Sequence, residues 1–271
     1  MSFAQTVILG AIAGLTIYLG LPFARLRSGS RGLRTLLSGI SAGILVFLLF
    51  DVLGHATEPV EKSIVARDWG QLTILSIVYV VGMGVGLLGL LYAQRLTGAS
   101  RSGVGPGAMA LAEAEPVAVG RDALRLGMVI ATGIGLHNFS EGLVIGQSAA
   151  AGQVSLALLL IIGFALHNAT EGFGIVGPLV AVGLRPSWRW LALAGLIGGG
   201  PTFLGTIIGT AVTSPVLFVA FLALAAGAIL YVVGELIAWG RRTSWELTLW
   251  GIFLGFLFGL ATDLVLVAAG A

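Results

Sequence analysis

Two of the three histidines in this chain belong to a heptapeptide that occurs twice, and each is followed four residues later by a glutamate. The two copies read LHNFSEG at 136–142 and LHNATEG at 166–172. Side chains four residues apart share one face of an α-helix, so the imidazole and carboxylate of each copy can face a common partner. Imidazole nitrogens and carboxylate oxygens are ligands that Zn²⁺, Fe²⁺ and similar ions favour. The repeat therefore indicates a site for a divalent transition metal ion.

Both copies lie within apolar stretches long enough to cross a membrane as helices. At about 1.5 Å per residue, His137 falls roughly 17 Å into its helix and His167 roughly 20 Å into the next, near the middle of a hydrocarbon core about 30 Å thick. The connection between these helices, about 148–152, is short enough to require an antiparallel hairpin. The two motifs are therefore expected to meet, with two imidazoles and two carboxylates converging on one point.

Two carboxylates inside a bilayer need compensation, because each ionised group there costs at least a few kcal/mol. A divalent cation would balance both charges, and the asparagine amides of the motif could complete its coordination. The predicted metal ligands are His137, Asn138, Glu141, His167, Asn168 and Glu171. Binding is expected to weaken at low pH, since a histidine ligand must be neutral and a glutamate ligand ionised.

The composition of the chain excludes a water-soluble protein. Of its 271 residues, 57% are hydrophobic and 10% are charged, whereas about a quarter of the residues in a soluble domain are charged. Its 42 glycines are expected to let membrane helices approach one another closely. Cysteine is absent, which excludes a thiolate metal site and a disulfide framework.

Eight apolar stretches, bounded by charged residues or by clusters of Gly, Pro and Ser, define the expected helices. They fall at about 5–24, 33–54, 71–93, 124–147, 153–177, 189–211, 215–238 and 246–268. These stretches predict an all-α integral membrane protein with eight transmembrane helices, forming a single polytopic domain over residues 1–271. The longest polar stretch, about 94–123, is expected to be a flexible loop.

The distribution of basic residues predicts the orientation of these helices. The chain has 14 Lys and Arg residues, and all but Lys62 and Arg67 fall on one face. The positive-inside rule places that face, with the loop at 94–123, in the cytoplasm and both termini on the extracytoplasmic side. We expect a multi-pass protein of the plasma (inner) membrane whose partner is the lipid bilayer. Because the basic residues lie on several loops without interleaved aromatic residues, no nucleic-acid partner is expected.

The paired HNxxEG motifs on the fourth and fifth of eight helices resemble the ZIP (Zrt/Irt-like) family of metal transporters. This resemblance implies that the six motif residues are transport-site ligands, in a family whose fourth and fifth helices often carry a two-metal centre. It also implies uptake of divalent metal, zinc above iron, manganese or cadmium, toward the cytoplasm. A homodimer and an elevator-like movement of helices 1, 4, 5 and 6 against the other helices are further implications. The metal would be the transported substrate, with no prosthetic group.

The sequence departs from the family pattern at two places. Many members have proline before the motif glutamate, where this chain has Ser140 and Thr170, so a gentler helix break is expected. On the sixth helix the family commonly has a Glu-Pro pair, which here corresponds to Gly200-Pro201. Gly200 is thus an altered second-site position, and we expect one strong metal site with at most a weak neighbour. Restoring a carboxylate at Gly200 would be expected to strengthen that neighbour.

Three further residues are candidates for a path to or from the site. Asp51 and His55 lie one turn apart near the outer end of the second helix, where they could form an entry relay with Glu58 or simply a solvated helix end. Glu235, on the cytoplasmic half of the seventh helix, resembles an acidic residue of the family and could guide ions toward the cytosol. A hydrogen bond to a neighbouring helix is the alternative for Glu235.

Two other interpretations of the repeated motif remain open at the level of sequence. The polar side chains could pair only with one another and fix helix packing. The same His/Glu set could instead hold a metal that activates water, as in an intramembrane metal-dependent hydrolase. No further acid, base or nucleophile accompanies the motif, so the chain is expected not to be an enzyme.

Overall fold

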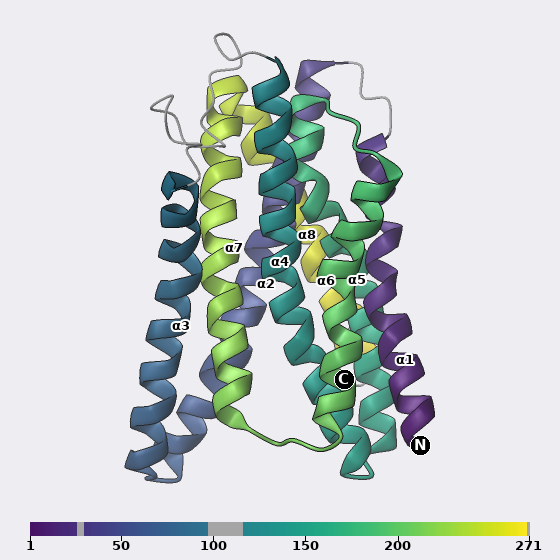
Figure 1. The fold of residues 1–271 in the computed structure, drawn as a ribbon, viewed down its shortest axis with the longest axis vertical. Coiled ribbons are helices and arrows are strands. Elements are labelled where there is room, and N and C mark those ends of the chain that lie inside the picture. Colours follow the sequence, from purple (N-terminus) through teal and green to yellow (C-terminus); the bar gives the residue numbers. More distant parts are fainter. Residues whose placement is uncertain (26–29, 97–115, 270–271) are drawn as a thin grey trace.

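The computed structural model describes residues 1–25, 30–96 and 116–269, and these residues form helices joined by short turns (Figure 1). Eight of the helical segments are long and apolar enough to cross a membrane. No strand occurs among the described residues. The predicted all-α integral membrane fold is therefore confirmed.

The helices have the following bounds in chain order. They are α1 (Phe3–Leu15), the 3₁₀ segments η1 (Thr16–Leu19) and η2 (Leu21–Arg25), α2 (Arg31–Val65), α3 (Trp69–Leu96), α4 (Pro116–Ala150), α5 (Val154–Val182), α6 (Trp188–Gly209), α7 (Pro215–Thr243) and α8 (Trp245–Ala269). Serine side chains cap α2, α6 and α7 by accepting hydrogen bonds from backbone N–H groups in the first turn. Such caps satisfy donors that a helix start otherwise leaves unpaired.

The first membrane span is not one continuous α-helix. After Leu15 it continues as two 3₁₀ segments that end at Arg25. The Thr16 hydroxyl donates a hydrogen bond of 2.7 Å to the carbonyl of Ala13, and such bonds to the preceding turn bend helices. Pro22 lacks an N–H and reinforces the change in helix type. The span predicted at 5–24 is therefore present, with a break in its middle.

Several helices are longer than the apolar stretches that predicted them. α2 ends at Val65 rather than near residue 54, and α4 begins at Pro116 rather than near residue 124. Proline suits the first position of a helix, where its missing N–H needs no partner. The loop predicted at about 94–123 is thus helical at both of its ends, and its central part, 97–115, lies outside the described residues.

The helices pack as two groups of four. The most extensive contacts join α4 with α6, α2 with α8, and α3 with α7, while α1 packs on α5 and α6. In Figure 1, α3 and α7 lie at one side of the bundle and α1 at the other. One group contains α1, α4, α5 and α6, and the other contains α2, α3, α7 and α8, with α5 packed on α2 and α4 on α7 where the groups meet.

Glycines allow the helices that carry the motifs to approach at backbone distance. A Cβ atom added to Gly142 of α4 would collide with the carbonyl oxygen of Thr202 on α6, and one added to Gly205 of α6 would collide with that of Phe139 on α4. Dispersion and small-residue contact hold membrane helices together, because lipid gives little hydrophobic drive for their association. This close contact fixes the rotation of α4, and therefore the direction of its polar side chains.

Candidate metal site

The two motifs meet because α4 and α5 form an antiparallel hairpin. The turn between them contains Gly152 with a positive φ of 75°, a conformation that glycine adopts without steric cost. A hydrogen bond of 2.9 Å from the backbone N–H of Gln153 to the carbonyl of Ser148 closes the turn. The predicted hairpin is confirmed, and it brings residues 33 positions apart into contact.

His137 lies beside one carboxylate from each motif. Its Nε2 atom is 3.3 Å from Oε1 of Glu141 on the same helix and 3.8 Å from Oε1 of Glu171 on α5. The three side chains are between 0% and 4% exposed. One imidazole and two carboxyl groups are therefore gathered in the protein interior.

The Asn138 amide joins this cluster to α6. Its Nδ2 group donates a hydrogen bond of 2.9 Å to Oε2 of Glu171 and another of 2.9 Å to the carbonyl of Gly198. Its Oδ1 atom is buried and has no hydrogen-bond partner among the described residues. The two donated bonds orient the side chain and leave its oxygen available as a ligand.

Asn168 joins the cluster to α1 in a similar way. Its Nδ2 group donates a hydrogen bond of 3.1 Å to the carbonyl of Ala13. Thr16 donates a further hydrogen bond of 2.6 Å to the carbonyl of Ala165 on α5. The last turn of α1, just before the break in the first span, therefore supplies a carbonyl that Asn168 uses.

The sequence did not predict that the backbone carbonyls of Ala13 and Gly198 would accept hydrogen bonds from the motif asparagines. Neither residue has a side chain that signals chemistry, and the contact depends on how α1 and α6 are rotated against the hairpin. The run of three glycines at 198–200 was the available signal for Gly198, because glycine permits a neighbouring side chain to reach the backbone.

The remaining motif side chain, that of His167, lies outside the described side chains, although its backbone is part of α5. Among the side chains that the structure does describe, no group of three or more His, Cys, Asp or Glu residues is placed so that it could hold a metal ion. His137 contacts Glu141 and Glu171 directly, side chain to side chain. The role of His167 as a ligand stays a prediction.

Asp51 and His55 lie on α2 within electrostatic reach of the cluster. Both interact electrostatically with His137 and with Glu141. Nδ1 of His55 is 3.4 Å from Oδ1 of Asp51, and the two side chains are 53% and 21% exposed. Exposure thus decreases from His55 to Asp51, and a role for either residue in an access path stays a prediction.

The structure places Gly200 and Glu235 apart from this arrangement. A Cβ atom at Gly200 would have only Leu196 of its own helix within 4 Å, and Leu196 is 58% exposed. Position 200 therefore faces away from α4 and α5, in contrast to Gly198. Glu235 is half-buried on α7, in the group of helices that does not carry the motifs.

α4 and α5 pass through the motifs without interruption. Ser140 and Thr170, where many ZIP proteins have proline, are both buried within continuous α-helix. The Oγ atom of Ser140 has no partner among the described residues. The sequence predicted a gentler helix break at these two positions, and the structure shows no break there. The physical reason is that proline removes a helical hydrogen bond and serine does not.

A family model described as ZIP Zinc transporter matches residues 110–262. The matched segment contains both copies of the heptapeptide and covers more than half of the 271 residues. A comparison with curated proteins gave no match. The eight apolar helices of the described residues agree with the matched family. The chain therefore belongs to the ZIP zinc transporter family, whose members carry divalent metal ions across membranes.

Proposed function

We propose that this protein carries Zn²⁺ as its principal substrate, with iron, manganese and cadmium ions as further candidates, through a site on α4 and α5. The observation that carries the proposal is the position of His137 Nε2 between the carboxylates of Glu141 and Glu171. Two carboxylates match the double charge of the ion, and nitrogen ligands favour transition metals over Mg²⁺ and Ca²⁺.

Small rotations of the three described side chains toward a common point would convert their mutual contacts into metal coordination. The oxygen atoms of Asn138 and Asn168 are buried and have no hydrogen-bond partner among the described residues, so each can join the ligand set. We include His167 in the proposed ligand set because it holds the same position in the second heptapeptide as His137 holds in the first. A partly hydrated ligand set of this kind binds well enough to remove water from the ion and still releases it.

We infer that transport proceeds toward the cytoplasm. Arg185 and Arg189 lie where α5 joins α6, at the end of the bundle opposite to Lys62 and Arg67, which lie where α2 joins α3. The positive-inside rule supports a cytoplasmic location for the arginine-bearing end and an extracytoplasmic location for both termini. Asp51 and His55 would then form the access path from the extracytoplasmic side, and Glu235 would lie on the path from the metal site to the cytoplasm.

Movement of α1, α4, α5 and α6 as a unit follows from the family resemblance, and the packing of α1 on α5 and α6 and of α4 on α6 supports it. The site lies within this unit, because Asn138 and Asn168 connect it to α6 and α1. We extend the proposal to a homodimer in the plasma membrane on the strength of the same resemblance. The hydrolase interpretation is not favoured, because the family consists of transporters.

Purified protein in liposomes should accumulate Zn²⁺ or Cd²⁺ when the ion is supplied outside. Glu141→Ala and His167→Ala should abolish this uptake while leaving the elution volume and helical circular dichroism unchanged. Gln147→Ala is a matched control, because Gln147 lies on α4 beyond the motif and its side-chain amide donates a hydrogen bond of 3.0 Å to the carbonyl of Val212, outside the site. Unchanged uptake in both site variants would refute the proposal.

A further inference from the structure

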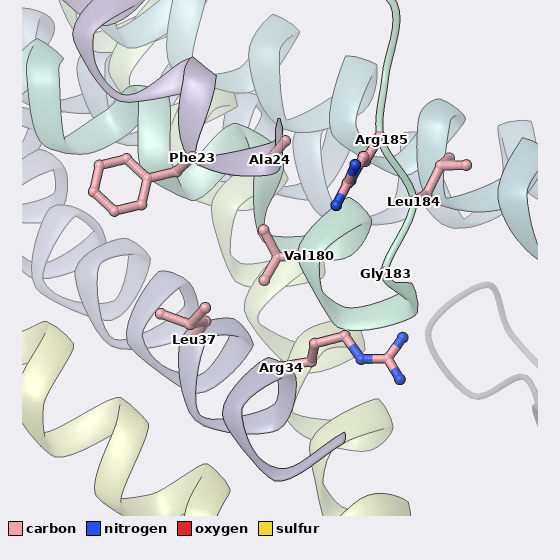
Figure 2. Close-up of a pocket in the computed structure, with 8 residues that line it drawn as sticks. All are labelled: Phe23, Ala24, Arg34, Leu37, Val180, Gly183, Leu184 and Arg185. Atoms are coloured by element: carbon pink, nitrogen blue, oxygen red, sulfur yellow. The ribbon is translucent and has the colours of Figure 1, made fainter. Parts of the chain in front are cut away.

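A polar cavity separate from the His/Asn/Glu cluster lies near the junction of α5 and α6, at the end of the bundle opposite to the α4–α5 turn. Its volume is about 90 Å³. Figure 2 shows Phe23 and Leu37 on its apolar side and Arg34, Gly183 and Arg185 on the other. These residues come from η2, the start of α2 and the end of α5, so the cavity lies between the two groups of helices.

The cavity has an excess of positive charge. Arg34 and Arg185 are among its lining residues, and none of the lining residues in the described part of the chain is acidic. Neither arginine takes part in any of the ion pairs found among the described residues. The Nε atom of Arg34 is buried and lacks a hydrogen-bond acceptor in the described part of the chain. A buried donor without an acceptor carries a free-energy cost that a ligand oxygen would remove.

The end of α5 holds the Arg34 side chain in place without satisfying that donor. The backbone N–H groups of Gly183 and Leu184 bond the carbonyls of Val180 and Leu179 at 3.0 Å and 2.9 Å, so these acceptors are already engaged. Gly183 has a φ of 70°, and a Cβ atom there would collide with Nη1 of Arg34. Glycine therefore both closes the helix end and leaves room for the guanidinium group.

We propose that this cavity binds a phosphate-type anion, either the phosphate of an anionic lipid headgroup or a free inorganic phosphate. Guanidinium groups bind phosphate oxygens in pairs of parallel hydrogen bonds, and basic pockets between helices at the cytoplasmic side are suited to anionic headgroups. The apolar wall formed by Phe23 and Leu37 suits the membrane boundary, where a headgroup meets the acyl region. This site is independent of the metal site proposed above.

An anion bound in this cavity would affect the relative position of α2 and α5. Arg34 belongs to α2, whereas Arg185 and Gly183 follow α5, which carries the second metal-binding motif. An anion bound in the cavity stabilises the arrangement in which residues of α2 and of the α5–α6 connection line it together, because a ligand favours the state that it binds more tightly. Occupancy therefore favours the present position of α5 relative to α2.

Native mass spectrometry of the purified full chain in detergent tests the proposal. The probes are phosphatidylglycerol, phosphatidylcholine as a neutral lipid, and inorganic phosphate, the last followed by the shift in melting temperature. Arg34→Gln and Arg185→Gln should each weaken phosphatidylglycerol binding about fivefold, the effect expected for one basic residue at a membrane surface. Arg31→Gln and Arg189→Gln remove exposed arginines near the same end of the bundle and should change binding less than twofold.

A loss confined to the cavity variants with phosphatidylglycerol alone supports a lipid headgroup site, and an equal loss with inorganic phosphate supports a free-anion site. Arg185 is exposed, so Arg185→Gln keeps the test valid if Arg34→Gln does not fold. Equal binding of phosphatidylcholine and phosphatidylglycerol, or an equal loss in the cavity variants and the control variants, would overturn the proposal.

Discussion

His137 on α4 and Glu171 on α5 face one another, with Nε2 of the imidazole 3.8 Å from Oε1 of the carboxylate. This contact connects the two copies of the motif, which lie on different helices. Asn138 reinforces it from one residue further along α4 by donating a hydrogen bond to the other oxygen of Glu171. The paired motifs therefore form one site rather than two.

Replacing Glu171 by glutamine should weaken Zn²⁺ binding. The variant loses the carboxylate charge that would face the ion. Loss of a group that only orients a ligand weakens metal binding roughly 10- to 100-fold, so the dissociation constant should increase by at least this factor. Calorimetric titration measures the affinity, and the melting temperature in metal-free detergent shows whether the fold is intact.

Glu61→Gln is the matched control for this change, because Glu61 is exposed on α2. It should leave both the affinity and the melting temperature unchanged. Full Zn²⁺ affinity in Glu171→Gln would argue against Glu171 as a ligand.

Replacing Asn138 by leucine should weaken metal binding and also destabilise the fold. The change leaves Oε2 of Glu171 and the carbonyl of Gly198 without the donor that Asn138 supplies. An unsatisfied buried acceptor costs about 1–3 kcal/mol, which should appear as a lower melting temperature with and without metal. A purely ligating role would instead lower only the stabilisation gained on adding Zn²⁺, and that result would contradict the positioning role.

Replacing Asp51 by asparagine should slow uptake at low Zn²⁺ concentration. The Asp51 carboxylate is partly exposed and interacts electrostatically with His137, Glu141 and Glu171, so it raises the local cation concentration near the buried ligands. We expect the KM for uptake to rise by about 2- to 5-fold with little change in maximal rate, and the effect to diminish at high salt.

Glu58→Gln is the comparison for Asp51→Asn. Glu58 lies on the same helix, is 53% exposed and pairs with Lys62 at 2.6 Å, so its loss should leave KM unchanged. If the two variants behave alike, the access path does not depend on Asp51.

Replacing Gly200 by glutamate should not create a second metal site, contrary to what the sequence alone suggested. A side chain at this position extends toward Leu196 and the exposed face of α6. The number of Zn²⁺ ions bound per chain should stay at the wild-type value in a calorimetric titration. An added ion in Gly200→Glu would mean that α6 can rotate toward the hairpin.

The sequence was sufficient to predict the eight spans, the α4–α5 hairpin and the pairing of the motifs. Hydropathy detects a membrane-spanning helix directly, and the i, i+4 spacing fixes which motif residues share a face. Helix lengths were less predictable, because α2 and α4 extend through polar residues that an apolar window does not detect.

The contacts around the site could not be predicted for a different reason. The use of the Gly198 and Ala13 carbonyls, and the outward direction of position 200, depend on how far each helix is rotated about its axis. That rotation follows from close backbone contacts such as those of Gly142 and Gly205, which no local sequence pattern specifies.

The most direct test of the metal site is anomalous scattering from crystals of the full chain grown with Zn²⁺ or Cd²⁺. An anomalous peak is predicted between α4 and α5, with Zn²⁺ about 2.0–2.2 Å from Nε2 of His137 and from carboxylate oxygens of Glu141 and Glu171. A fully occupied ion bound elsewhere, with these three side chains still in contact only with one another, would contradict it.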